Sequence, residues 1–567
     1  RLSADTGAQD TAPARPIDRT APKLVSWMPG PVDAIPATRQ AMQRPGDPII
    51  LNFDEPLDPK TIAAGVTLDG DGIKVENLRT KLDGTAVVIN PEGGLKHGVN
   101  YTLNISNTLT DIAGNGATSQ SLEFAVPDIG ETSSVAQRSP LALTTYPGYP
   151  CETTKVNLAA GTHGQCWDEA PGGEAGDILP LSTLPQDRPI VVVFSQSMNL
   201  DSIRLGDTFK VEKGDVDTKK IADVSGRLEK NKQRIRFYPD QPWEVDSYYR
   251  YTMTSAENGD CSAVICGENG QALQTDLLED PEDNGGQPLT IYFKGAKSQS
   301  SVFTPLRNLP IRDTNSNYVV DCNSAGSTNC LEPFDHPGSD AEGFQPSANA
   351  AKLLVNTEKD DSSRVGCSPR DEDCPRNKFI YQTYGLNTEV VGPATDPETG
   401  KEGVAVLLYP TMLATTSADT YVDLAIFVAH AETGPQILRM RYAKDDPNCT
   451  GDNCARNSLI PGIIIEGDDG APIFKTNAEL TLDAPVLSAD VPVSHNLYSY
   501  PFTLKLSGRV TFFDDGRMQI EQRNTNIPEI NVAATALGTI PINIPLIIPN
   551  QGVYLNFISN PIKEITE

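Results

Sequence analysis

Two stretches of the amino-terminal half repeat one another at fixed spacing, and this repeat constrains the fold more than any other feature. The first reads Pro-Ile-Ile-Leu-Asn-Phe over residues 48–53, and the second reads Pro-Ile-Val-Val-Val-Phe over residues 189–194. A further block follows each, with the same internal spacing in both copies: Pro91, Leu95 and Tyr101 match Pro239, Trp243 and Tyr249. A segment that is used twice in one chain is normally a folded unit. The sequence therefore predicts two copies of one module.

The composition of each copy indicates that the module is built from strands. Short runs rich in Val, Ile and Tyr are separated by Pro, Gly, Asn and Asp, for example at residues 101–105 and 248–252. No long run with apolar residues at helical spacing competes with them. Frequent turns between short strands are typical of two antiparallel sheets packed face to face. The large apolar residues of the repeat are then expected in the core, and they include Phe53, Phe194, Tyr101 and Tyr249.

The blocks of the repeat come in a distinctive order. An apolar run ending in Phe is followed by Leu57-Asp58 or Met198-Asn199, by a Pro-to-Tyr block, by a turn such as Asp111-Ile-Ala-Gly-Asn115, and by a closing strand that ends in Phe. This order resembles the bacterial Ig-like domain of the SbsA surface-layer type over residues 20–127 and 180–295. The resemblance implies an extracytoplasmic, often tandem β-sandwich that serves as a spacer or adhesive module. It implies no catalytic residues, because a fold does not carry a function by itself.

The whole chain is predicted to be all-β. Its length is that of several domains, and strand patterns return in its carboxyl-terminal part, for which no family resemblance is found. We expect two tandem Ig-like β-sandwiches, then a disulfide-stapled, loop-rich region, then a further β-sandwich-like domain. The expected segments are a flexible tether (1–20), the first sandwich (21–127), the second sandwich with disulfide-bearing insertions (128–295), the loop-rich connection (296–377) and the β-rich domain with its apolar tail (378–567).

The ten cysteines fall into five pairs that are close in sequence. An even number of cysteines in tight pairs within polar loops suggests local disulfides, which persist outside the cytoplasm. A zinc site is the alternative, but no pair has the Cys-x-x-Cys spacing of a zinc knuckle. We therefore expect these nearest-neighbour disulfides: Cys151–Cys166, Cys261–Cys266, Cys322–Cys330, Cys367–Cys374 and Cys449–Cys454.

The charge of the chain limits its partners. Lys and Arg number 46 against 75 Asp and Glu, so the net charge is −29, and nucleic acid would be repelled. No apolar run is long enough for a transmembrane helix. The sequence starts at Arg1, so we expect any signal peptide to have been removed or to lie upstream. A lipid anchor upstream of Arg1 is one hypothesis for attachment, and the expected location is the cell surface, the outer membrane or the periplasm.

Common catalytic motifs are absent from the sequence, including Gly-x-Ser-x-Gly, His-Glu-x-x-His and the phosphate-binding loop. His430 and His495 are two histidines that a neighbouring carboxylate could turn into a base, although lone histidines are more often surface or packing residues. A carboxylate pair for glycoside hydrolysis stays open. We predict no catalytic residue and no cofactor other than calcium.

Calcium is the leading metal candidate because hard oxygen ligands lie in several turns. Asp111 with Asn115, and Asp468 with Asp469, are the two candidate positions. Neither matches the twelve-residue EF-hand spacing. The alternative for both is an ordinary solvated turn.

The carboxyl-terminal part carries an uncharged segment from residue 530 to 562. Its prolines exclude a continuous helix and place an extended segment at a sheet edge or across a surface. It either packs over its own domain or forms a surface for a partner subunit, a lipid or a hydrophobic ligand. The candidate interaction residues are Ile540, Ile542, Ile544, Leu546, Ile547 and Ile548.

Two functions of different class follow from these features. The first is a noncatalytic extracytoplasmic protein in which the Ig-like modules present a β-rich domain to an envelope partner or to copies of itself. The second is a secreted hydrolase with its catalytic site in residues 296–567 and the Ig-like modules as spacers. The missing motifs favour the first.

Overall fold

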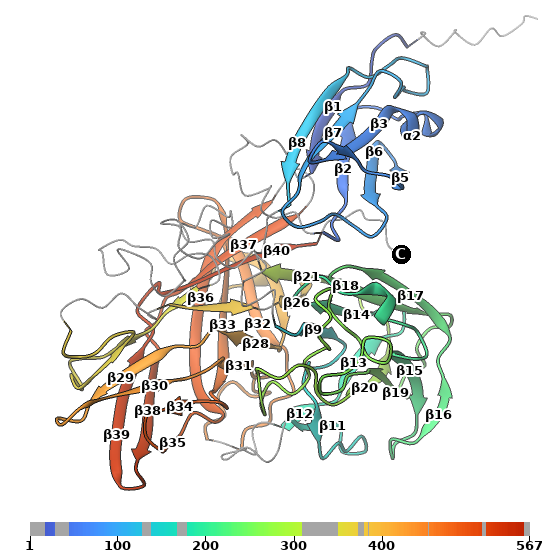
Figure 1. Cartoon of the computed structure of the whole chain (residues 1–567). Coiled ribbons are helices and arrows are strands. Elements are labelled where there is room, and N and C mark those ends of the chain that lie inside the picture. Colours follow the sequence, from blue (N-terminus) through green and yellow to red (C-terminus); the bar gives the residue numbers. More distant parts are fainter. Residues whose placement is uncertain are drawn as a thin grey trace, which may run out of the picture.

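The computed structural model describes residues 18–28, 45–126, 138–166, 178–308, 350–371, 379–383, 385–451, 453–512 and 517–560. Strands dominate these residues, with one short α-helix, α2 (Ile62–Gly65), and 3-10 turns at Pro59–Thr61 and Leu200–Ser202 (Figure 1). The all-β fold class is therefore confirmed. Within the described ranges, no helix has the length and apolar character needed to cross a membrane.

The first module is a sandwich of two four-stranded sheets. Its core lies between them and contains the buried Phe53 and Tyr101. One sheet has the order β1 (Leu24–Met28), β2 (Ile49–Phe53), β6 (Ala86–Pro91), β5 (Leu78–Asp83), and the other has the order β4 (Ile73–Lys74), β3 (Val66–Gly70), β7 (Asn100–Ile105), β8 (Gln120–Ala125).

The second module repeats this arrangement and adds to it. Its core contains the buried Phe194 and Tyr249. One sheet has the order β9 (Ala142–Tyr146), β14 (Ile190–Phe194), β18 (Arg234–Pro239), β17 (Gly226–Asn231), and the other has the order β16 (Lys220–Asp223), β15 (Phe209–Gly214), β19 (Tyr248–Met253), β20 (Leu289–Ala296), β13 (Ser182–Pro185). A small sheet of β10 (Thr153–Thr154), β11 (Thr162–Cys166) and β12 (Ile178–Pro180) is additional to the repeat.

The repeated Tyr makes the same ring contact and the same hydrogen bond in both modules. Its ring stacks on the Phe of the closing strand, with ring centres 5.3 Å apart for Tyr101 and Phe124 and 5.5 Å apart for Tyr249 and Phe293. Each Tyr hydroxyl accepts a 2.9 Å hydrogen bond from the backbone N–H five residues earlier. A buried Tyr needs a partner for its hydroxyl, and this local bond supplies it. The repeat seen in the sequence is thus a repeat in structure, with the expected Phe and Tyr residues buried.

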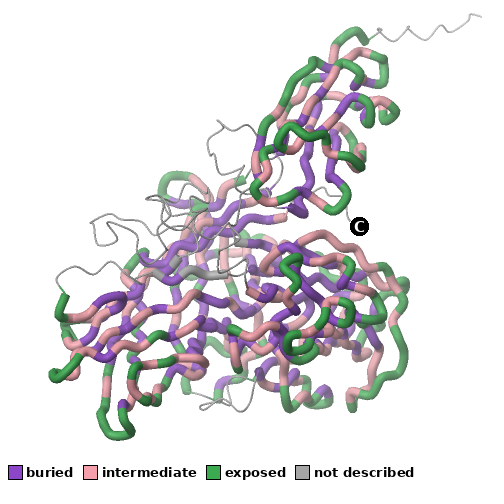
Figure 2. Tube along the Cα trace, in the orientation of Figure 1, coloured by how far each residue is buried: buried purple, intermediate pink, exposed green. Residues whose placement is uncertain are grey.

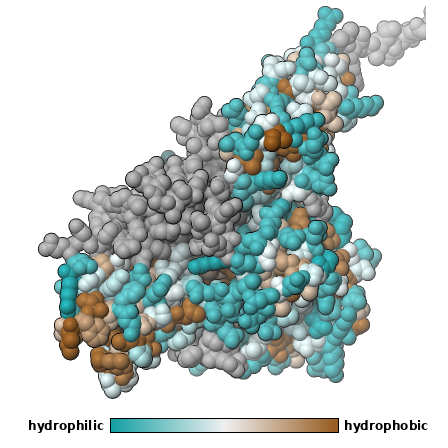
Figure 3. Space-filling model, viewed as in Figure 1, coloured by the Kyte–Doolittle hydropathy of each residue, from teal (hydrophilic) through white to brown (hydrophobic). Residues whose placement is uncertain are grey.

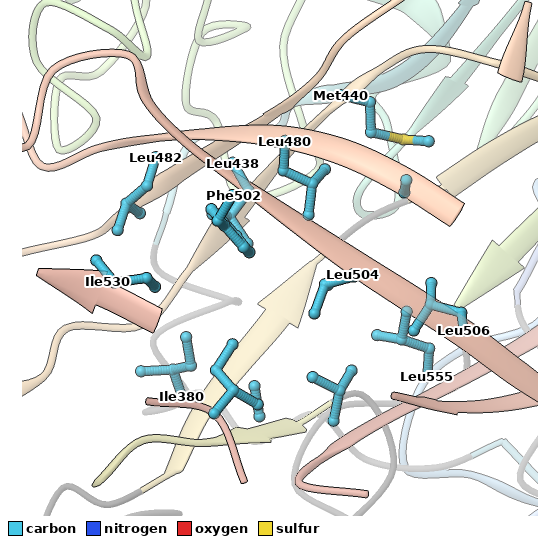
Figure 4. Close-up of a cluster of buried hydrophobic side chains, with 14 of the residues drawn as sticks. Ile380, Leu438, Met440, Leu480, Leu482, Phe502, Leu504, Leu506, Ile530 and Leu555 are labelled. Atoms are coloured by element: carbon cyan, nitrogen blue, oxygen red, sulfur yellow. The ribbon is translucent and has the colours of Figure 1, made fainter. Parts of the chain in front are cut away.

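The carboxyl-terminal domain is built around one large sheet. In addition to the pairings along the sheet, β21 pairs with β40 and β33 pairs with β36, so that the sheet closes on itself around a long apolar core. Figure 4 shows part of this core, with Leu480, Phe502 and Ile530 among the labelled side chains. The order is β21 (Val302–Asn308), β26 (Gly385–Thr395), β27 (Glu402–Tyr409), β32 (Ile460–Glu466), β33 (Pro472–Asp483), β31 (Ile437–Met440), β28 (Met412–Thr415), β25 (Phe379–Thr383), β22 (Ala350–Lys352), β40 (Val553–Ser559), β37 (Met518–Asn524), β36 (Tyr500–Phe512).

Two smaller sheets extend from the same domain at the lower left of Figure 1. Figure 2 shows buried stretches along their strands and exposed residues at their outer turns. The first has the order β24 (Ser363–Val365), β29 (Asp419–Asp423), β30 (Val428–Glu432), β34 (Ser488–Ala489), and the second has the order β23 (Leu354–Val355), β39 (Ile540–Ile547), β38 (Glu529–Ala536), β35 (Val493–His495).

Three of the expected disulfides are present in the structure. They join Cys151 to Cys166, Cys261 to Cys266 and Cys449 to Cys454. Cys367 is also disulfide-bonded, whereas its expected partner Cys374 and the pair Cys322–Cys330 lie outside the described residues. Residues 1–17 of the tether and residues 309–349 and 372–377 of the loop-rich connection lie outside them as well.

The second module packs directly on the carboxyl-terminal domain. The Tyr149 hydroxyl lies 3.2 Å from the carbonyl oxygens of both Thr411 and Met440. The Arg188 guanidinium forms an ion pair with Glu389 of β26. Because both contacts are largely buried, they fix this module against the large sheet.

The first module is attached at one end, as its position above the rest of the chain in Figure 1 shows. The Asp47 carboxylate accepts two hydrogen bonds from the Arg307 guanidinium of β21, at 2.7 and 2.5 Å, and both side chains are buried. Beside it, the Gly46 N–H donates to Gln233 Oε1 of the second module at 2.9 Å. A buried ion pair is geometrically specific, and removing one partner leaves an uncompensated charge.

His163 ties the small sheet to the second module. The backbone N–H of Tyr292 donates to His163 Nε2 at 2.8 Å, so Nδ1 carries the hydrogen and donates to Thr153 Oγ1 at 2.9 Å. Burial lowers the pKa of His163 to about 4. The folded protein therefore holds this imidazole neutral.

Replacing Arg307 should be strongly destabilising. Arg307→Met leaves the buried Asp47 carboxylate without its cation, and we expect the free energy of unfolding to fall by about 3–5 kcal/mol. Urea unfolding followed by tryptophan fluorescence measures this. The control is Arg509→Met, which breaks the exposed Arg509–Asp469 pair and should cost no more than about 1 kcal/mol. Equal effects of the two substitutions would contradict the prediction.

Protonation of His163 should destabilise the fold as the pH falls. The folded-state pKa of about 4 lies below the unfolded value of about 6.5, so the unfolded chain binds the proton first. The stability contribution is complete above pH 6.5 and is lost as the pH drops toward 4, by about 3 kcal/mol. Urea unfolding at pH 7 and pH 4.5 should show a smaller loss for His163→Gln than for the unsubstituted protein. The same loss in both proteins would show that other groups account for it.

Candidate apolar binding site

A pocket lies between the two smaller sheets of the carboxyl-terminal domain. Its cavity volume is about 70 Å³, and the whole space free of atoms around it, open solvent included, is about 790 Å³. Apolar pockets with few polar groups are the usual form of small-molecule binding sites. The lining residues are mostly Val, Leu, Ile and Ala, and most of them come from β29, β30, β38, β39 and the segment 487–497, which contains β35.

One wall of the pocket is the β38–β39 hairpin. Side chains alternate between the two faces of a strand, so Val532 and Ala534 of β38 and Ile542 and Ile544 of β39 line the pocket together. The register confirms this, because Val532 lies opposite Ile544 and Ala534 lies opposite Ile542. The intervening residues of β39 include prolines, whose missing N–H is tolerated in an edge position.

The opposite wall is the β29–β30 hairpin. Val422 lies opposite Ala429 and Thr420 lies opposite Ala431, and all four line the pocket. Two of the four are alanines, whose small side chains fill little of the space beside them.

A buried ionic network positions the third part of the lining, the segment 487–497. Asp483, at the end of β33, accepts hydrogen bonds from Arg439 Nε at 2.8 Å and from the Ser499 backbone N–H at 2.8 Å. The Ala484 N–H then donates to the Leu497 carbonyl. Because the charges are buried and paired, the two ends of this segment are held next to each other.

Polar groups at the pocket are few and mostly satisfied. His430 Nε2 lies 2.9 Å from Asp419 Oδ1, and His495 Nδ1 accepts a 3.1 Å hydrogen bond from the Leu497 N–H. Burial lowers the pKa of His495. Gln436 is buried in the wall, and its Nε2 has no hydrogen-bond partner among the described residues. None of the described lining residues is Lys, Arg, Asp or Glu.

The uncharged segment predicted from the sequence supplies much of this site. Ile542, Ile544 and Leu546 line the pocket, and the latter two are buried. Ile548 is also buried, Ile547 is half-buried and Ile540 is exposed. Sequence reasoning did not find the β29–β30 wall. The signal available there was the alternation of small and polar residues over 428–432, which is too short to separate a pocket wall from an ordinary edge strand.

The calcium candidates are placed differently. Asp111 lies with Asp18 and Glu55 in one acidic group, and its carboxylate accepts two hydrogen bonds from Asn115. Burial and the nearby carboxylates of Asp18 and Asp111 raise the pKa of Glu55. Calcium binding at Asp111 and Asn115 stays a prediction.

The second calcium candidate is not part of a group of three or more Asp, Glu, His or Cys ligands in the described part of the chain. Asp469 pairs with Arg509 at 2.9 Å. Asp468 is fully exposed and has Lys401 at 3.5 Å. Its site, too, stays a prediction.

Comparisons with known proteins bear on both ends of the chain. Residues 18–126 match the family model described as a bacterial Ig-like domain. The chain carries a bacterial Ig-like domain. The match covers the first module and agrees with its sandwich topology.

The chain is also similar to alkane uptake protein B of Marinobacter nauticus, with 58% identity over 595 aligned positions. The similarity covers 100% of this chain but 56% of that protein, so the chain spans about half the length of this curated relative. A crystal structure of the S-layer protein rSbsC, residues 31–844, shares 10% identity and covers 88% of this chain and 67% of its own. Its TM-score of 0.17 is too low to carry an argument.

Proposed function

We propose that this chain is the ligand-binding part of a noncatalytic uptake protein of the bacterial envelope, and that the pocket holds an uncharged hydrocarbon chain. The observation that carries the proposal is the pocket, whose described lining is almost wholly apolar and contains no charged residue. The similarity to a protein named alkane uptake protein B supports the same ligand class.

The energetics of the pocket suit an alkyl chain. Each buried CH₂ group contributes about 0.8 kcal/mol, so a chain of moderate length can bind without any polar contact. A carboxylate would gain no cation from the described lining, and beside His430 it would meet the Asp419 and Asp490 carboxylates. An unpaired charge in such surroundings is costly. The preferred ligand is therefore a neutral hydrocarbon.

In this proposal the Ig-like modules position the binding domain within the envelope. The bacterial Ig-like domain, the disulfides and the similarity to the uptake protein support an extracytoplasmic location. A partner protein or further copies of the chain would receive the ligand, and a lipid anchor upstream of Arg1 would hold the chain at a membrane.

The alternative, a secreted hydrolase, has less support. His430 does pair with a carboxylate, Asp419. The hydroxyls of the described lining belong to Thr420 and Thr433, whose Oγ1 atoms donate to the carbonyls of Ala431 and Gly434. The pocket therefore offers no activated nucleophile among its described residues.

Filling the pocket should abolish hydrocarbon binding. Ala534→Phe places a ring in the space between the hairpins, whereas Ala533→Phe places the same ring on the exposed face of the same strand. Binding of radiolabelled hexadecane to the purified chain, measured by gel filtration, should be lost in the first variant and kept in the second. Unfolding curves of both variants show whether the fold is intact. Undiminished binding by a folded Ala534→Phe protein would refute the site.

The pocket should discriminate against fatty acids. Hexadecane and hexadecan-1-ol should compete for the site at pH 8, whereas hexadecanoate should be weaker by about 100-fold or more, because its carboxylate would lose hydration without gaining a partner. Displacement of bound radiolabelled hexadecane measures the three affinities. Methyl hexadecanoate, which has no charge, is the control and should compete. Hexadecanoate binding as tightly as its methyl ester would show that the pocket recognises carboxylates.

A further inference from the structure

The turn between β29 and β30 exposes large apolar side chains. Ile426 is 91% exposed, more than any other large apolar residue in the described part of the chain, and the neighbouring Phe427 is 43% exposed. Isolated exposed apolar residues need no explanation, but several at one place mark an interaction site.

This turn is held rigidly rather than left loose. The Leu424 N–H donates to the Phe427 carbonyl at 2.9 Å, and the Ala425 N–H donates to Asp423 Oδ1 at 2.8 Å. The Arg370 guanidinium donates to both Asp423 oxygens, at 2.6 and 2.9 Å, and to the Ala425 carbonyl at 3.0 Å. The same contact lowers the pKa of Asp423 to about 2, so this carboxylate stays ionised and its charge is balanced by Arg370.

The turn between β38 and β39 is also apolar. Leu537 is 52% exposed and Ile540 is 37% exposed. Leu537 has a φ of +53°, a backbone conformation that Gly, Asn or Asp adopts far more readily. Its N–H donates to the Pro492 carbonyl at 2.9 Å. An apolar side chain is thus displayed where a polar or small residue would be the less strained choice.

These two turns, residues 424–427 and 536–541, are referred to as the apolar tips. They cap the two hairpins whose inner faces wall the pocket. Figure 3 shows apolar residues gathered at the lower left, where Figure 1 places these hairpins. The tips and the pocket are therefore parts of one structure.

Charge determines which surface the apolar tips can meet. Neither tip contains a charged residue. The chain as a whole carries a net charge of −29, which repels anionic lipid headgroups. The tips are therefore best matched by an apolar surface that carries no charge.

We infer that the apolar tips dock the protein on the surface of a liquid hydrocarbon, next to the pocket that takes up a single hydrocarbon molecule. This inference rests on the proposed function. Docking at the tips shortens the path of the ligand through water, since a hydrocarbon molecule that leaves the liquid phase reaches the pocket between the same two hairpins.

The test compares adsorption with pocket binding in the same proteins. The tip variant Ile426→Ser/Phe427→Ser/Leu537→Asn is mixed with a hexadecane emulsion, and protein left in the water is measured after the droplets are removed by centrifugation. Adsorption should fall about tenfold or more relative to the unsubstituted chain, while binding of radiolabelled hexadecane in solution stays unchanged. The control Ile73→Ser/Ile112→Ser removes two exposed apolar residues of the first module and should adsorb normally.

Two further arms separate this inference from the proposed function. The pocket variant Ala534→Phe should lose hexadecane binding yet still adsorb to droplets. This result would show that the pocket binds hexadecane and that adsorption does not depend on the pocket. Vesicles of phosphatidylcholine and of phosphatidylglycerol should retain less protein than droplets of equal surface area. Equal adsorption of the tip variant and the unsubstituted chain, or tighter retention by either vesicle, would overturn the inference.

Discussion

The Asp483 carboxylate holds together the part of the molecule on which the pocket depends. It ends β33, binds the Arg439 guanidinium of β31 and fixes the Ser499 backbone just before β36. The segment 487–497 runs between these two points and supplies one side of the pocket. Because the three groups are buried, a loss of any one would leave a charge or a donor without its partner. The two ends of this segment, which leaves the large sheet and supplies strands to the smaller ones, are thus held side by side.

The amino-terminal modules could be predicted from the sequence because their determinants are local. The stacking Tyr of each module, Tyr101 or Tyr249, closes a Pro-to-Tyr block that has the same internal spacing in both copies. This block is therefore visible as a repeat, although the Phe of the closing strand lies farther along the chain in the second copy. The disulfides Cys261–Cys266 and Cys449–Cys454 were predictable for the same reason, since each closes a loop of a few residues.

The carboxyl-terminal domain could be predicted only as strands. Its closure depends on β21 pairing with β40, at opposite ends of the domain in sequence, and no local pattern reports such a pairing. The pocket is similar: Ile544 belongs to a segment that the sequence singles out as uncharged, but Ala429 and Leu497 come from unremarkable segments. The sequence indicates that the apolar tail packs against its own domain or a partner, and in the structure one face of this segment lines the pocket.

The attachment of the first module has a mechanical consequence. In the described residues no sheet continues from the first module into the second, so tension applied to the amino-terminal end is not shared along a strand ladder. Among the described contacts, it bears on the Asp47–Arg307 pair and on the hydrogen bond from Gly46 to Gln233. Breaking these two contacts opens no strand pairing in either sandwich. The first module can therefore come away whole, lengthening the molecule under load while the body that carries the pocket keeps its shape.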